Sequence, residues 1–350
     1  MTVTIKDLLQ RAYELRASDL HILAGSPPVF RIDGQLKIFD DRPLSVHETE
    51  SFARKIMPET IWNEFLTRGE VDFNYELPGI SRFRMNAFRQ KEAVSIAIRL
   101  IPEKVPTLEE LKLPNTLAKL MEHPHGLILV TGPTGSGKST TQAAMINYIN
   151  ERYARHIITL EDPIEYVHHH KRSIINQREI GKDTKSFASG LRAALRQDPD
   201  IILVGEMRDL ETISTAITAA ETGHLVLATL HTNNAVQTID RIIDVFESYQ
   251  QRQIRLQLAS VLLGVISQRL FPLKGRYGRI AATEILLNNS SVANLIRSEK
   301  IHQISNVLQT SRAEGMHTLE MSIQELVKKG FISYETAKVY LNPGDANGYL

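Results

Sequence analysis

The sequence predicts an α/β protein of two domains, a small α+β unit followed by a mostly parallel sheet with helices on both faces. Three observations support this prediction. The chain has 350 residues, which is enough for about two hydrophobic cores. Residues 1–101 combine amphipathic helices with strands of alternating polarity. From Leu108 onward, short apolar strands alternate with helices, which is typical of a parallel sheet.

The first domain, residues 1–101, is expected to contain three helices and five strands. Its second helix has a capping box, because Ser45 is followed by Glu48. The expected helices cover residues 4–16, 45–57 and 59–68, and the expected strands cover residues 18–25, 28–34, 70–77, 81–90 and 93–101. Residues 102–113 are interpreted as a linker, since Pro102 and Pro106 stiffen an extended segment.

The second domain, residues 114–290, is expected to hold the parallel sheet. Its expected strands are 127–131, 156–160, 173–176, 201–204, 224–230 and 279–287. Its expected helices are 139–151, 186–197, 210–221, 235–246 and a longer one over 250–270. Residues 291–350 are predicted to be mainly helical, with Gly315 and Gly330 as helix stops and residues 342–348 as a loose tail.

The composition excludes several classes of protein. There is no cysteine, so disulfides and cysteine-ligated metal centres are excluded. A net charge of +1 gives no support for a nucleic-acid-binding field over the whole chain. No apolar run approaches the roughly 18 residues of a transmembrane helix. The sequence therefore predicts a cytoplasmic protein whose attachment to a membrane would require a partner.

Residues 132–140, GPTGSGKST, match the phosphate-binding loop pattern G-x-x-x-x-G-K-[ST] completely. An apolar strand precedes the loop and a helix follows it, so backbone N–H groups are presented at the positive end of a helix dipole. The alternative is a glycine-rich turn that happens to contain a lysine. The predicted nucleotide-binding residues are Gly132, Pro133, Thr134, Gly135, Ser136, Gly137, Lys138, Ser139 and Thr140.

Charge and reach assign roles within this loop. Lys138 is placed to contact the β- and γ-phosphates of ATP, and the hydroxyl of Ser139 is placed to bind Mg²⁺. ATP and Mg²⁺ are therefore the expected cofactors.

Two acidic segments follow predicted strands, at the edge where an open α/β sheet places its ligand. One is residues 161–165 and the other is residues 198–206, in which Gly205 stands where an Asp commonly holds the metal. We infer that Glu206 polarises the attacking water and that Glu165 completes the water shell of the metal. The alternative is that both segments are helix caps and solvated turns.

Several histidines are candidates for a role near the nucleotide. His224 begins a predicted strand and His231 follows it, and a histidine beside a γ-phosphate could sense the nucleotide by hydrogen bonding. A structural role is the alternative for both. His168, His169 and His170 are consecutive and cannot all face one ion, so a surface loop is expected there.

Arg82 and Arg84 lie two residues apart on a predicted strand and therefore on one face, opposite Phe83 and Met85. They are either solvated edge charges or groups that reach γ-phosphate charge across a boundary between domains or subunits. Arg89 and Arg99 are weaker candidates for the same role.

Together these motifs resemble one family, the secretion ATPases of type II and type IV systems and of type IV pili. The phosphate loop, the acidic box 159–166, the Walker B segment 191–209 and the histidine box 222–232 occur in that family's order. Residues 17–21, 82–86 and 315–319 resemble its pilus-retraction members, and the similarity covers nearly the whole chain. Residues 291–298 depart from the C-terminal motif of those members, because an Ile and an Arg are replaced.

The resemblance implies a PAS-like N-terminal domain, a RecA-like ATPase domain and a homohexameric ring. ATP would lie between the domains, with Arg82 and Arg84 approaching it. The implied function is a Mg²⁺-dependent motor for pilus retraction and twitching motility, peripheral to the inner membrane through a platform protein. The alternatives are pilus extension, type II secretion, a motor on nucleic acid, and an adaptor that binds ATP without turnover. No direct contact with nucleic acid is expected.

Overall fold

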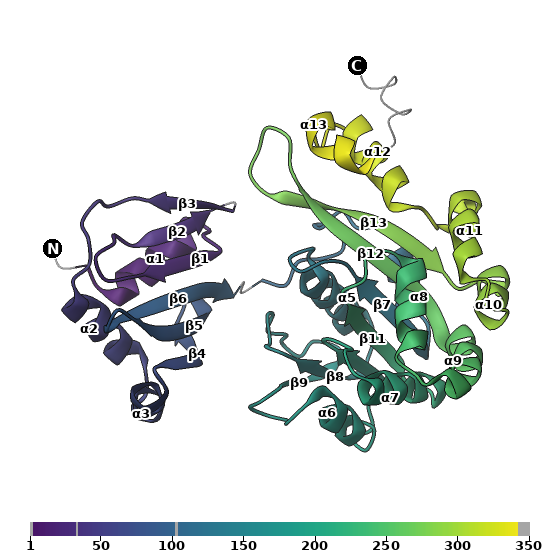
Figure 1. Ribbon diagram of the computed structural model, residues 1–350, viewed down its shortest axis with the longest axis horizontal. Helices are drawn as coiled ribbons and strands as arrows, with labels where there is room; N and C mark the ends of the chain where they lie inside the picture. Colours follow the sequence, from purple (N-terminus) through teal and green to yellow (C-terminus); the bar gives the residue numbers. More distant parts are fainter. Residues whose placement is uncertain (1–2, 33, 102–103, 342–350) are drawn as a thin grey trace. The chain divides into compact units, whose positions relative to one another are not determined.

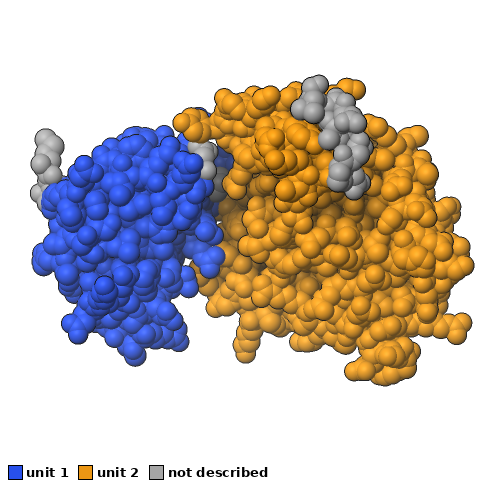
Figure 2. All heavy atoms as spheres, turned by 45° about the horizontal axis from the view of Figure 1, so that its top comes forward, with its two compact units in different colours: residues 1–104 blue, residues 105–350 orange. Residues whose placement is uncertain are grey.

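The computed structural model describes residues 3–32, 34–101 and 104–341. The chain forms two compact units, Met1–Lys104 and Val105–Leu350, coloured separately in Figure 2. Residue 33 of the expected strand 28–34, residues 102 and 103 of the expected linker, and the expected loose tail 342–348 lie outside the described residues.

The first unit is built on a six-stranded antiparallel sheet with the order β3-β2-β1-β6-β5-β4 (Figure 1). The strands are β1 (Asp19–Ile22), β2 (Val29–Ile32), β3 (Gln35–Ile38), β4 (Glu70–Leu77), β5 (Ser81–Gln90) and β6 (Ala93–Ile101). The edge strand β3 was not predicted. It is short, and Leu36 and Ile38 are exposed, so it lacks the alternating burial by which a strand is recognised.

The helices of this unit are α1 (Ile5–Glu14), α2 (Val46–Ile56) and α3 (Glu59–Arg68). The predicted capping box of Ser45 and Glu48 is confirmed at the start of α2. Apolar residues of the helices, such as Leu9, Phe52 and Phe65, share one core with Phe83 and other sheet residues. The helices therefore cover the face of β5 that bears Phe83.

The second unit is built on a seven-stranded sheet with the order β13-β12-β7-β11-β10-β8-β9. Its strands are β7 (Gly126–Thr131), β8 (His156–Glu161), β9 (Ile174–Glu179), β10 (Ile201–Val204), β11 (Leu225–Leu230), β12 (Leu262–Pro272) and β13 (Arg279–Leu287). All neighbouring pairs are parallel except β12 with β13. The prediction of a mostly parallel sheet is confirmed.

Helices cover both faces of this sheet (Figure 1), and β7 shows why its sequence is continuously apolar. Leu127 and Leu129 belong to one core and Ile128 and Val130 to another, because successive side chains point to opposite faces. The helices are α4 (Thr116–Leu120), α5 (Lys138–Arg152), α6 (Phe187–Ala194), α7 (Leu210–Glu221), α8 (Ala235–Asp244) and α9 (Ser248–Val261). The short helix α4 was not predicted.

The prediction of one helix over residues 250–270 is wrong. Helix α9 ends at Val261, and β12 begins at the next residue. Strand β12 lies between β7 and β13 and is mostly buried. Its first half, residues 262–266, is apolar apart from Gly264, and periodicity cannot distinguish so short a buried run from the continuation of a helix. Gly264 is the local feature that favours a strand, since glycine inside a strand often marks a close approach of another backbone. A Cβ at Gly264 would lie 2.8 Å from the Leu286 carbonyl oxygen of β13.

The C-terminal part is helical, as predicted. It contains α10 (Ser290–Arg297), η1 (Ile301–Gln303), α11 (Ile304–Thr310), η2 (Arg312–Glu314), α12 (Leu319–Lys328), α13 (Tyr334–Ala337) and η3 (Lys338–Tyr340). Helices α10 and α11 contribute to the main core, whereas Ile323 of α12 and Ile332 pack with Phe271 of β12. Among the described residues, no helix is both long and apolar enough to cross a membrane.

Candidate active site

The phosphate loop connects β7 to α5, as predicted. Gly132, Gly135 and Gly137 have φ angles of +144°, +77° and +89°, a region that side chains other than glycine rarely adopt. Lys138 is the first residue of α5. The loop therefore leads into a helix N-terminus, where unpaired backbone N–H groups favour an anion.

A cavity of about 310 Å³ lies beside this loop, lined entirely by residues of the second unit. Five segments that are far apart in the sequence line it: the loop with the start of α5, the end of β8 with the acidic segment after it, the start of α6, the end of β10 with the segment after it, and the end of β11 with His231. The predicted site residues that line it are Thr134, Gly135, Lys138, Ser139, Glu165, Glu206 and His231.

Lys138 is held over the loop by its own backbone. Its Nζ atom donates hydrogen bonds to the carbonyl oxygens of Gly132 at 2.8 Å and Pro133 at 3.1 Å. Burial lowers the pKa of Lys138, and the negative charges of Glu206 and Glu165 oppose this effect. Both carboxylates therefore favour the charged form of the Lys138 ammonium group. Three of the predicted site residues thus interact electrostatically.

Glu206 follows β10 and is contacted from two sides. Oε1 of Glu206 lies 2.9 Å from Nε2 of His231 and also accepts from Nε of Arg208. The pKa of Arg208 is raised, first by its hydrogen bond to Glu206 and then by the charge of Glu206. Arg208 lines the cavity but was not singled out from the sequence, although its place two residues after Glu206 was a usable signal.

Gly205 stands where related nucleotidases commonly have an Asp, and the structure gives a steric reason for the glycine. A Cβ at this position would lie 2.9 Å from the backbone oxygen of Leu160 and 3.4 Å from Cα of Glu161. The Gly205 N–H donates to the same Leu160 oxygen at 2.8 Å. A side chain at residue 205 would therefore collide with β8.

Within the acidic segment, Glu161 is more buried than Glu165. Oε1 of Glu161 accepts hydrogen bonds from Oγ1 of Thr159 at 2.6 Å and from Nε2 of Gln177 at 3.0 Å. Burial raises the pKa of Glu161, and these hydrogen bonds oppose the rise. Glu165 is the residue of this segment that was predicted from the sequence to act at the metal. The position of Glu161 at the end of β8 was the signal that distinguished it.

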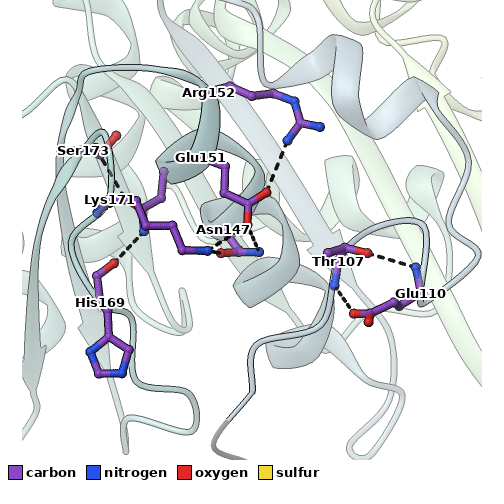
Figure 3. A network of polar contacts seen from close by, with 9 residues as sticks. Thr107, Glu110, Asn147, Glu151, Arg152, His169, Lys171 and Ser173 are labelled. Atoms are coloured by element: carbon purple, nitrogen blue, oxygen red, sulfur yellow. Dashed lines mark hydrogen bonds and ion pairs between the residues drawn. The ribbon is translucent and has the colours of Figure 1, made fainter.

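Residues 168–173 form a segment fastened to α5 (Figure 3). Lys171 donates through Nζ to Asn147 at 2.9 Å and Glu151 at 2.7 Å, and the His169 carbonyl accepts from Asn150 at 2.8 Å. His168 lines the cavity, and burial lowers its pKa to about 4. The surface-loop expectation fits the exposed residues His169 and His170 but is wrong for His168.

His224 is not brought to this cavity, in contrast to the expectation for a catalytic histidine. It precedes β11, whereas His231 follows the carboxyl end of that strand. The His224 ring contacts the Ala219 carbonyl through Nδ1 at 2.9 Å. Its position at the opposite end of a strand separates it from the phosphate loop.

Arg82 and Arg84 belong to the first unit. They lie on β5, with Phe83 and Met85 fully buried on the opposite face, so the predicted division of faces is confirmed. Nε of Arg82 lies 3.7 Å from Oε2 of Glu76.

Arg89 and Arg99 each have a local partner in the same unit. The guanidinium of Arg89 lies 5.5 Å from the centre of the Phe65 ring. Nε of Arg99 donates to Asp19 at 2.9 Å. Both contacts lie within the first unit.

The donor set of the cavity suits a magnesium ion. The Ser139 hydroxyl and the carboxylates of Glu161, Glu165 and Glu206 all line it, and Mg²⁺ prefers such oxygen ligands. Within residues 3–32, 34–101 and 104–341, no group of three His, Cys, Asp or Glu side chains is arranged to hold a metal by itself.

The fold and this cavity define a phosphate-loop nucleotide-binding protein. A family model described as "Type II/IV secretion system protein" matches residues 1–339, and the chain belongs to that family.

Several curated relatives match nearly the whole chain. The type IV pilus retraction ATPase PilT of Pseudomonas aeruginosa is 48% identical over 334 residues, covering 95% of this chain and 97% of that relative. A twitching motility protein of Neisseria gonorrhoeae is 48% identical over 330 residues, covering 93% and 88%.

Among solved structures, the crystal structure of the pilus retraction motor PilT with bound ADP matches with a TM-score of 0.89. That match has 48% identity and covers 98% of this chain and 99% of that chain. The X-ray structure of the Legionella pneumophila ATPase DotB matches with a TM-score of 0.87 at 29% identity, covering 97% and 96%. The predicted family resemblance is confirmed.

Proposed function

We propose that this protein is a Mg²⁺-dependent ATPase that acts as a hexameric motor for type IV pilus retraction and twitching motility. The observation that carries the proposal is the convergence of Lys138, Ser139 and Glu206 on one cavity, in a chain 48% identical to a pilus retraction ATPase over nearly its full length.

In this mechanism, the loop amides and Lys138 bind the β- and γ-phosphates. The Ser139 hydroxyl would hold Mg²⁺, with Glu165 near its water shell, and the ion would neutralise charge that develops on the phosphates. Glu206 orients the attacking water and is itself held by His231 at 2.9 Å. Positioning and electrostatic stabilisation account for most of the rate in phosphoryl transfer.

The first unit supplies the arginines of the proposed cycle. We assign it a PAS-like fold, and we assign a RecA-like fold to the sheet domain. ATP bound between domains of a six-membered ring would meet Arg82 and Arg84, and their approach and release would deform the ring. Force would pass to a platform protein at the cytoplasmic face of the inner membrane.

The biochemical test measures ATP turnover by the purified full chain. Glu206→Gln is expected to leave ATP binding near that of the wild type while turnover falls by roughly 100-fold or more, since the amide removes the charge that polarises water. Lys138→Ala is the contrasting variant and should lose binding itself. Unchanged turnover in Glu206→Gln would remove Glu206 from the mechanism.

The cellular test separates the alternative functions. Deletion of the gene is expected to leave surface pili in place while pulling stops. Loss of the pili would favour an extension motor, and loss of secretion without a pilus defect would favour a type II system. Stimulation of the ATPase by DNA would favour a nucleic-acid motor.

A further inference from the structure

Gln268 of β12 is a buried amide whose two polar atoms both contact the phosphate loop or the helix after it. The residue is 2% exposed. Nε2 donates to the backbone oxygen of Ser136 at 2.7 Å, and Oε1 accepts from Oγ1 of Thr141 at 2.9 Å. One side chain from a distant strand therefore bridges the end of the loop and the first turn of α5.

The glycines at the fixed positions of the loop pack against this same residue. A Cβ on Gly132 would lie 2.4 Å from the backbone oxygen of Gln268, and a Cβ on Gly137 would lie 3.1 Å from its Nε2. Both distances are shorter than ordinary van der Waals contact. The loop therefore packs closely against Gln268 at these two positions. This packing favours glycine at residues 132 and 137, in addition to their positive φ angles.

The hydrogen bond to Ser136 has a consequence for the next amide. The Ser136 carbonyl and the Gly137 N–H belong to one peptide group, and in a trans peptide they point in opposite directions. With the carbonyl held by Gln268, the Gly137 N–H must point away from β12. Gly137 has no Cβ to restrict its backbone, so this orientation depends on a partner outside the loop.

We propose that Gln268 is a positioning residue for nucleotide binding, which fixes the peptide between Ser136 and Gly137 so that the Gly137 N–H is presented to the phosphates. The inference rests on the proposed ATPase function and deepens it. Gln268 itself makes no contact with the nucleotide in the proposed role. It acts through the loop, as a donor to Ser136 and an acceptor from Thr141.

The test uses the full chain, with ADP affinity and steady-state kinetics as readouts. Gln268→Leu removes both hydrogen bonds at similar volume, and Gln268→Glu keeps the shape but places an oxygen opposite the Ser136 carbonyl, where a donor is needed. Both variants should weaken ADP binding and raise KM for ATP by about tenfold or more, while kcat changes by less than about threefold, because uniform binding is lost.

Two further variants make the result specific. Thr141→Val removes only the donor to Oε1, and its effect on ADP affinity should be non-additive with that of Gln268→Leu, since both act through one contact. Thr283→Val is the matched control. It removes a buried hydrogen bond to His317, 3.0 Å long, from the neighbouring strand β13 and should leave ADP affinity within about twofold of the wild type.

The outcomes separate this inference from the proposed function. A wild-type protein that neither binds ADP nor hydrolyses ATP would refute the function itself. A normally active wild type with ADP affinity and KM unchanged in both Gln268 variants would overturn the role of Gln268 alone. If Gln268→Leu does not fold, Gln268→Glu decides. Failure of both variants to fold would make Gln268 a structural residue and overturn the proposal.

Discussion

Nε2 of His231 lies 2.9 Å from Oε1 of Glu206, and this contact joins the residues that follow two neighbouring parallel strands. Glu206 comes after β10 and His231 after β11, which pair in parallel register. Nδ1 of the same ring lies 3.5 Å from Nζ of Lys138. His231 therefore stands between the lysine of the phosphate loop and the carboxylate assigned to the attacking water.

Replacing His231 with Ala is expected to lower kcat by about tenfold or more while changing ADP affinity by less than about threefold. The reason is that Glu206 loses a contact that holds its carboxylate, whereas Lys138 keeps its hydrogen bonds to Gly132 and Pro133. Steady-state kinetics and ADP titration measure the two quantities. His123→Ala, at an exposed histidine of the same unit, is the control. Wild-type kcat in His231→Ala would contradict the assignment.

The parts of the site that could be predicted are those at the ends of apolar parallel strands. Strands β7, β8, β10 and β11 read as short apolar runs, and the carboxyl ends of such strands meet at one edge of a sheet. The same reasoning predicts that Lys138, Glu206 and His231 lie close together. It failed for His224, because a residue at the start of a strand lies at the other edge.

Other features depend on packing that a single sequence does not display. The steric exclusion of a side chain at Gly205 comes from the Leu160 carbonyl of another strand. The raised pKa of Glu161 comes from its burial. Gln268 was predicted to lie in a helix, because the apolar residues 262–266 follow directly on α9. Its contacts with the loop arise only once β12 pairs with β7.

Glu161 is expected to make stability depend on pH. Its pKa in the folded protein is raised above the ordinary value of 4.5. Between pH 4.5 and the raised pKa, the native state therefore binds more protons than the unfolded state. Stability then falls as pH rises through that window. Glu161→Gln should abolish this part of the dependence, so the variant should gain stability relative to the wild type as pH increases from 4.5. Urea unfolding at several pH values measures the difference, and a difference independent of pH would contradict the prediction.

Gly205→Ala is expected to destabilise the second unit by about 1–3 kcal/mol, a usual cost of overpacking. The added Cβ would meet backbone, at 2.9 Å from the Leu160 oxygen, and backbone cannot move aside easily. Gly190→Ala is the matched control, because its Cβ would meet the Cδ2 end of the Leu160 side chain at the same distance and alanine favours its helix. Urea unfolding compares the two. Equal stabilities would show that β8 accommodates a side chain at residue 205.

Arg84→Ala is expected to reduce kcat by about tenfold or more without changing hexamer assembly or lowering the stability of the first unit. Arg84 lies opposite Arg99 across β5 and β6, and Arg99 is bound to Asp19 at 2.9 Å. Two neighbouring cations repel each other. Replacing Arg84 therefore removes an unfavourable charge interaction and is not expected to lower the free energy of unfolding. ATPase assays, light scattering and urea unfolding of the purified chain measure the three quantities. Arg68→Ala serves as the control, since Arg68 is exposed and paired with Glu64 on α3. Full ATPase activity of Arg84→Ala in an intact hexamer would return Arg84 to the role of a solvated charge on the sheet.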